Sequence, residues 1–144
     1  MNPLNYASLE ASKRLVEAGI VLGTEVCWSP IFDFNMSSVG KPVPIKDWEL
    51  MHREHINSSM WALKAIPAPS MAEVWRELPV YFDIDQCFQP NLVKVADDNK
   101  GVMYSAFYSL IVRKLPVPAC YQSANPTDAL IELRIWLEER KEGT

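Results

Sequence analysis

The two histidines of the chain, His52 and His55, enclose Arg53 and Glu54. Imidazole and carboxylate groups are ligands for zinc, which is usually held by four ligands in structural sites. Residues three apart share one face of a helix, whereas on a strand they point to opposite faces and cannot bind the same ion. Two histidines and one carboxylate are an incomplete set in either case. We therefore predict no metal site here, but a polar surface.

Paired carboxylates are a second source of chemistry. Asp83 and Asp85 are spaced for one face of a strand, and Asp97 and Asp98 are adjacent in a stretch that resembles a turn. Such pairs can serve acid–base catalysis or hold a divalent cation. Aspartates in turns more often bond to the local backbone. By themselves these residues predict no catalytic site.

The three cysteines, Cys27, Cys87 and Cys120, lie far apart and form no CxxC pair. Their odd number and irregular spacing are not those of a disulfide framework, so we expect a reduced protein. Nothing near them marks an activated thiolate, and Cys27 beside Trp28 suits a buried strand. The chain also lacks the glycine-rich patterns of phosphate-binding loops. No catalytic residue and no cofactor is predicted.

The composition is that of a folded, acidic protein. The 144 residues are 49% hydrophobic and 22% charged, which fits a single domain over residues 1–144. A net charge of −4 repels phosphate backbones, so nucleic acid is the least expected partner. The N-terminus does not have the pattern of a signal peptide, and no stretch approaches the roughly 20 apolar residues that span a bilayer. We expect a cytoplasmic protein that does not contact a membrane.

Helix signals are the clearest local patterns. The predicted helices cover residues 6–18, 71–78 and 126–140. Gly19 is placed to end the first helix in the left-handed conformation. Ser70 and Glu73 fit a capping box at the start of the second. Asn125 fits the cap of the third, where Asp128 is expected to reach back and close the same kind of box.

Strand-like segments fill most of the remaining chain. They cover residues 25–28, 31–34, 45–56, 60–66, 81–84, 92–95, 102–112 and 120–122. Pro30 predicts an edge position or a bulge between the first two segments. Residues 97–101 predict a turn, and residues 102–112 are the longest strand candidate. We predict an α+β fold with one mainly antiparallel sheet of about four to six strands, on which the three helices pack.

A faint internal similarity appears when Pro69 is aligned with Pro126. Ser70 then matches Thr127, and apolar residues of the two helices coincide. One interpretation is a duplicated strand–strand–helix unit. The simpler interpretation is that two capped amphipathic helices have converged on one pattern.

The five tryptophans indicate where a partner could bind. Trp75 and Trp136 lie on predicted helices and are expected to pack on the sheet. Trp48 and Trp61 border loops, and interfaces are enriched in exposed tryptophan. They are the predicted partner-binding residues. Base stacking on aromatic side chains is disfavoured by the acidic charge.

Three blocks of the sequence resemble a loose family of small, uncharacterised proteins encoded by bacteriophages and prophages. The blocks are Tyr6–Ile20, Pro67–Pro79 and Asn125–Leu133, and they cover about a quarter of the chain. The resemblance implies a phage-derived protein that acts inside the bacterial host. It implies no catalytic or binding residues, because none is assigned for that family.

These observations favour a non-catalytic accessory protein that binds a host or phage protein. A protein that binds a small ligand or nucleotide, including an enzyme with an unrecognised site, is the alternative if Asp83, Asp85, His52 or His55 converge in one cleft. A structural component of the virion is the second alternative and would form stable oligomers through an exposed apolar patch. The sequence does not predict the oligomeric state.

Overall fold

The computed structural model describes residues 2–33, 45–55, 65–79, 81–83, 86–110 and 116–142. Within these ranges the helices are η1 (Pro3–Asn5), α1 (Leu9–Glu17), η3 (Arg53–His55), α3 (Met71–Arg76) and α4 (Pro126–Glu142). The strands are β1 (Val26–Phe32), β2 (Ile45–His52), β3 (Ile66–Pro67), β4 (Tyr81–Asp83), β5 (Gln86–Asp97), β6 (Gly101–Leu110) and β7 (Pro116–Ser123). The predicted α+β class with three α-helices is confirmed.

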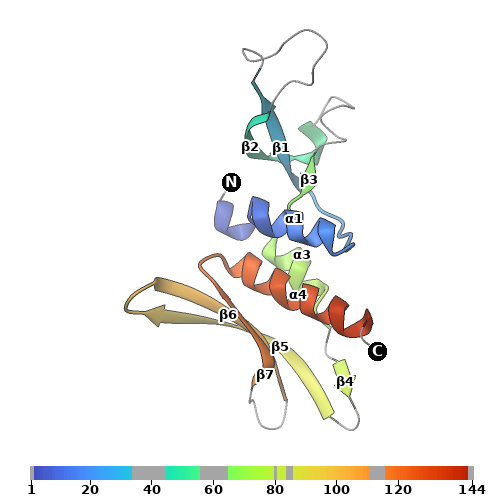
Figure 1. Cartoon of the computed structure of the whole chain (residues 1–144), viewed down its shortest axis with the longest axis vertical. Helices are drawn as coiled ribbons and strands as arrows, with labels where there is room; N and C mark the ends of the chain where they lie inside the picture. The colour runs from blue at the N-terminus through green and yellow to red at the C-terminus, as the bar shows by residue number, and fades with distance from the viewer. Residues whose placement is uncertain are drawn as a thin grey trace.

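The described strands form two antiparallel sheets, where a single sheet was expected. The smaller sheet has the order β2-β1-β3, and the larger has the order β4-β5-β6-β7. Figure 1 shows α3 and α4 between the larger sheet and α1, with the smaller sheet beyond α1. Alternating side chains reveal that a strand has two unlike faces, but they do not reveal which strands share a sheet.

The main core lies between α4 and the larger sheet. Leu130, Ile131 and Leu133 of α4 are fully buried, as are Ala106 and Tyr108 of β6. The Tyr108 hydroxyl donates a hydrogen bond of 2.9 Å to the carbonyl of Pro79, which satisfies its one buried polar group. Because both elements carry large buried side chains, α4 holds the larger sheet in place.

Two of the predicted strand boundaries differ from those in the structure. Pro30 lies inside β1 opposite Trp48, beyond the short contact of β1 with β3, and the register shifts between Ile31 and Phe32. The predicted edge or bulge is therefore confirmed, although the two predicted segments are one strand. Residues 92–95 belong to β5, which among the described residues has 12 residues and is longer than β6 with 10, whereas residues 111–112 of the predicted longest strand lie outside the described part of the chain.

The two halves are not built alike. In the first half β3 pairs with β1, whereas in the second half β7, the last strand, pairs with β6. The cap residues also disagree with the alignment that suggested duplication, because Ser70 caps α3 while Asn125, and not Thr127, caps α4. Convergence of two capped helices is the interpretation that fits these differences.

Candidate functional site

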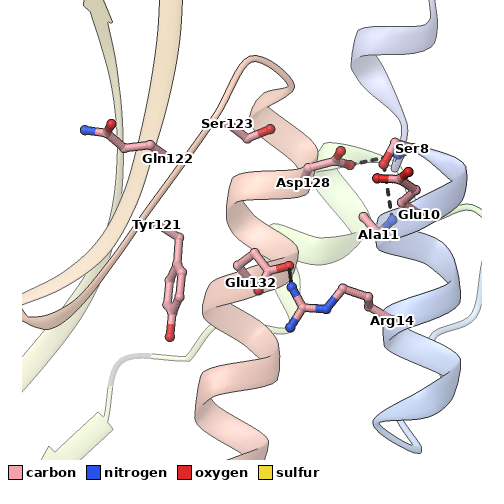
Figure 2. Close-up of a pocket in the computed structure, with 9 residues that line it drawn as sticks. All are labelled: Ser8, Glu10, Ala11, Arg14, Tyr121, Gln122, Ser123, Asp128 and Glu132. Atoms are coloured by element: carbon pink, nitrogen blue, oxygen red, sulfur yellow. Dashed lines mark hydrogen bonds and ion pairs between the residues drawn. The ribbon is translucent and has the colours of Figure 1, made fainter.

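A cleft of about 380 Å³ lies between α1, α4 and β7 (Figure 2). It combines acidic, basic and phenolic groups from segments far apart in the sequence. The lining residues are Ser8, Glu10, Ala11, Arg14, Tyr121, Gln122, Ser123, Asp128 and Glu132. Its volume falls in the range of small-molecule pockets, as does that of a second cleft of about 620 Å³ lined by Thr24, Glu25, His52, Arg53 and Glu54.

Asp128 occupies the end of the cleft near the start of α1. Its Oδ1 accepts a hydrogen bond of 2.8 Å from the backbone N–H of Ser8, and the Ser8 hydroxyl in turn accepts from the N–H of Ala11. Burial raises the pKa of Asp128, Glu10 adds to the rise, and the hydrogen bonds from Ser8 oppose it. The expected closure of the α4 cap by Asp128 is wrong, since this carboxylate caps α1 instead.

Asn125 begins α4 without help from Asp128. Its Oδ1 accepts from the N–H of Thr127 at 2.9 Å and from that of Asp128 at 3.4 Å. Its Nδ2 donates to the carbonyl of Tyr6 at 3.0 Å. The predicted N-cap is confirmed, and it also ties the start of α4 to the segment before α1.

An ion pair between Arg14 of α1 and Glu132 of α4 crosses the middle of the cleft. Arg14 is half exposed and Glu132 is largely buried, so solvent screens the pair only in part. Tyr121 of β7 also lines the cleft and lies beside α4 in Figure 2. Burial raises the pKa of its phenol, Glu139 and Glu132 raise it further, and Arg14 opposes the rise.

The polar groups of the cleft mostly bind one another. Asp128 holds Ser8 and Glu132 holds Arg14, while Glu10 is exposed to solvent. Each bond joins α1 to α4 and occupies a group that a ligand would need. We call these contacts the α1–α4 seam, and their geometry is that of a structural junction.

The histidine segment follows neither predicted geometry. His52 ends β2 and His55 lies in the following 3-10 turn, which places the two rings edge to face with centroids 6.1 Å apart. His55 Nε2 lies 3.6 Å from a carboxylate oxygen of Glu54, and all of these side chains are exposed. Among the described residues no group of three metal-ligating side chains forms.

The other candidate residues are dispersed. Cys27 is buried, as predicted for a strand beside Trp28, whereas Cys120 is exposed. The side chains of Asp83 and Cys87 lie outside the described part of the chain, as does Asp85. Their predicted convergence with the histidines is therefore not tested.

The tryptophans lie in different environments. Trp48 is half-buried on β2, and the ammonium of Lys13 lies 5.5 Å from the centroid of its ring, within cation–π range. Trp61 lies outside the described residues. Trp136 packs against Tyr108 as expected, but Trp75 is 42% exposed and does not lie in the core.

A further exposed feature was not predicted from the sequence. The distal part of the β5–β6 hairpin, residues 92–103, projects past the start of α4 in Figure 1, and we call it the hairpin arm. Val93, Val95 and Val102 on this arm are 44%, 38% and 47% exposed. The strands and their turn were recognised, but the exposure of Val102 depends on how far α4 extends over the sheet, and that of Val93 and Val95 depends on what covers the opposite face.

Comparison with known proteins supplies no assignment. The chain matches no model of a protein family, and no curated protein or solved structure is significantly similar to it. In the described part of the chain, no helix is long and apolar enough to cross a membrane.

Proposed function

We propose that this protein is a non-catalytic accessory protein of phage or prophage origin that binds a host or phage protein in the bacterial cytoplasm. The observation that carries the proposal is the hairpin arm. Val93 and Val95 project from one face of β5 and remain exposed at 44% and 38%. Neighbouring exposed valines on a projecting strand cost solvation free energy that a bound partner would recover.

The α1–α4 seam supports the non-catalytic part of the proposal. Its carboxylates already hold a backbone N–H and a guanidinium, and these contacts keep α1 on α4. A catalytic carboxylate must be within reach of substrate in the right protonation state. The seam therefore fits a structural role better than a catalytic one.

Binding of a small ligand is the second candidate, and the volume of the cleft favours it. About 380 Å³ can hold a small molecule, and Glu10, Asp128 and Glu132 would favour a cationic one. Such a ligand would have to displace Arg14 from Glu132 or bind beside the pair.

The test is capture of a partner by tagged full-length protein from lysate of its bacterial host, followed by reconstitution of the complex from purified components. We expect the double variant Val93→Thr/Val95→Thr to lose most of the binding. The matched control is Val16→Thr/Val21→Thr, which alters valines that are 55% and 92% exposed elsewhere on the surface. It should bind like the wild type.

Each other outcome has a meaning. A partner held equally well by both double variants contradicts a role for the hairpin arm. A metabolite recovered without any protein moves the function to the cleft. Stable homo-oligomers without a partner would support a structural component of the virion.

A further inference from the structure

Within the described part of the chain, the strand β5 has an open edge along most of its length. On one side β4 pairs only with residues Gln86–Phe88, and no other described residue pairs there. On the other side β5 pairs continuously with β6, from Phe88 opposite Leu110 to Asp97 opposite Gly101. From residue 89 to residue 97 the open side therefore presents backbone groups that a further strand can bind.

Pro90 indicates which amides face this edge. Proline has no N–H and is accepted within a sheet where that position faces away from the neighbouring strand. Backbone N–H groups alternate between the two sides of a strand, and the β5–β6 register has no shift. The amides of Leu92, Lys94 and Ala96 consequently share the open side with Pro90.

The side chains at this edge also alternate. Leu92 packs against the main core, so Lys94 lies on the same face of the sheet, while Val93 and Val95 lie on the opposite face. Lys94 is exposed and forms no ion pair or hydrogen bond with another described residue. The edge thus presents Val93 and Val95 on one face of the sheet and, between them in the sequence, the ammonium group of Lys94 on the other face.

We propose that the open edge of β5 binds an extended peptide segment of a partner protein by strand addition, with a carboxylate opposite Lys94 and apolar side chains opposite Val93 and Val95. The backbone groups of Leu92, Lys94 and Ala96 supply affinity, and the alternating side chains supply specificity. This inference rests on the proposed function and names the chemistry of the partner.

A second copy of this chain fits the edge poorly. A two-fold axis that pairs β5 with β5 of another copy sets residues of the same face opposite each other. When the axis passes near Val93, Lys94 or Val95, the two Lys94 ammonium groups are opposite or diagonal on one face. Diagonal neighbours lie about 7–8 Å apart, so the like charges repel each other. Lys94 therefore disfavours self-pairing and favours an acidic partner.

The test selects short random peptides on the full-length protein and on two charge-reversed variants. Wild type should enrich peptides with Asp or Glu between two apolar residues, and Lys94→Glu should enrich Lys or Arg at that position. Lys46→Glu, which reverses an exposed charge on β2, is the matched control and should select like the wild type. We expect the acidic peptide to bind Lys94→Glu roughly 5-fold more weakly than it binds the wild type.

Hydrogen exchange of the complex with the best selected peptide locates the contact. The amides of Leu92, Lys94 and Ala96 should exchange more slowly, whereas those of Val93 and Val95, which face β6, should change little. Protection in the cleft, or equal protection of all five amides, would overturn the proposal. Failure to enrich any alternating peptide would overturn it as well.

These outcomes separate the inference from the proposed function. If the captured partner depends on Val93 and Val95 but the peptide results fail, the arm binds through its face and the function stands. If sedimentation shows a wild-type dimer in which the amides of Leu92, Lys94 and Ala96 are protected from exchange, a second copy occupies the edge and the inference is wrong.

Discussion

The helices α1 and α3 begin with the same pair of capping hydrogen bonds, but one acceptor comes from the same helix in α3 and from another helix in α1. Both begin with serine, and the hydroxyls of Ser8 and Ser70 each accept from the backbone N–H three residues later at 3.2 Å. In α3 the backbone N–H of Ser70 donates to Glu73 of the same turn at 2.8 Å. In α1 the N–H of Ser8 donates to Asp128 of α4 at the same distance.

The difference shows how a cap can become a tertiary contact. Position N3 of α1 is Ala11, which has no acceptor, so the second half of the capping box comes from a residue 120 positions away. The cap of α3 can form as soon as its first turn forms. The cap of α1 is complete only when α1 packs on α4, so it contributes to the stability of the whole fold.

The largest expected effect comes from removing the distant half of the α1 cap. Asp128→Ala leaves the partly buried N–H of Ser8 without its acceptor, and we expect a loss of about 1–3 kcal/mol in the free energy of unfolding. Glu73→Ala removes the equivalent group from α3 and should cost about 0.5 kcal/mol. Urea unfolding of both variants measures the difference. Equal losses would mean that the contact with α4 adds nothing to the cap.

The serine hydroxyls should matter less and more equally. Ser8→Ala and Ser70→Ala each remove one acceptor of an N-cap, which costs about 1 kcal/mol. In double-mutant cycles Ser8 should couple to Asp128 and Ser70 to Glu73, while Ser8 and Glu73 should be additive because they share no partner. Coupling between Ser8 and Glu73 would contradict the separation of the two caps.

The sequence was sufficient for the local cap but not for the distant one. Ser70 and Glu73 are three residues apart, so helix geometry alone brings them together. Asp128 sits at a position that also suits the cap of its own helix, and the sequence contains no signal that directs it to Ser8. The same limit applies to Arg14 and Glu132, whose pairing follows from how α1 packs on α4.

The sheets show the same difference between local features, which were predicted, and contacts between distant segments, which were not. The turn at residues 97–101 was predicted, and Gly101 has the positive φ of 77° that it requires. The division into two sheets and the exposure of Val93 and Val95 were not predicted, because they depend on which strands pair and on what covers the sheet face opposite α4. The contact of Lys13 in α1 with the ring of Trp48 in β2 was not predicted either, because the two residues are far apart in the sequence.

The Arg14–Glu132 ion pair should contribute less than either cap. Replacing Arg14 with Gln should lower the free energy of unfolding by about 0.2–1 kcal/mol, because the exposed guanidinium is screened by water. The loss should shrink in high salt. Arg134→Gln breaks the more buried pair with Glu138 within α4, and only its salt dependence is compared, because this substitution also removes buried side-chain contacts. Urea unfolding of both variants in low and high salt measures how much of each loss is electrostatic. A salt-dependent loss for Arg14→Gln would show that the pair between α1 and α4 stabilises the seam.

The smallest change is expected for Asp128→Asn, because the amide oxygen can still accept from Ser8. Burial raises the pKa of Asp128 in the folded protein above its ordinary value of 3.8, so the folded state binds this proton more tightly than the unfolded state. As pH falls through the folded pKa towards 3.8, wild type should gain stability relative to Asp128→Asn. Above the folded pKa the difference between them should be constant.

Measuring the same difference in a Glu10→Gln background separates the causes of the shift. Burial is the larger cause and Glu10 the smaller, so most of the pH-dependent gain should remain when the charge of Glu10 is removed. Other carboxylates titrate in both members of each pair and cancel from the difference. A gain that disappears with Glu10 would mean that repulsion across the open cleft, and not burial in the seam, sets the pKa of Asp128. A gain that persists would mean that burial sets the pKa of Asp128. The α1 cap would then carry a desolvation cost, because its carboxylate comes from α4 and is buried where the two helices pack.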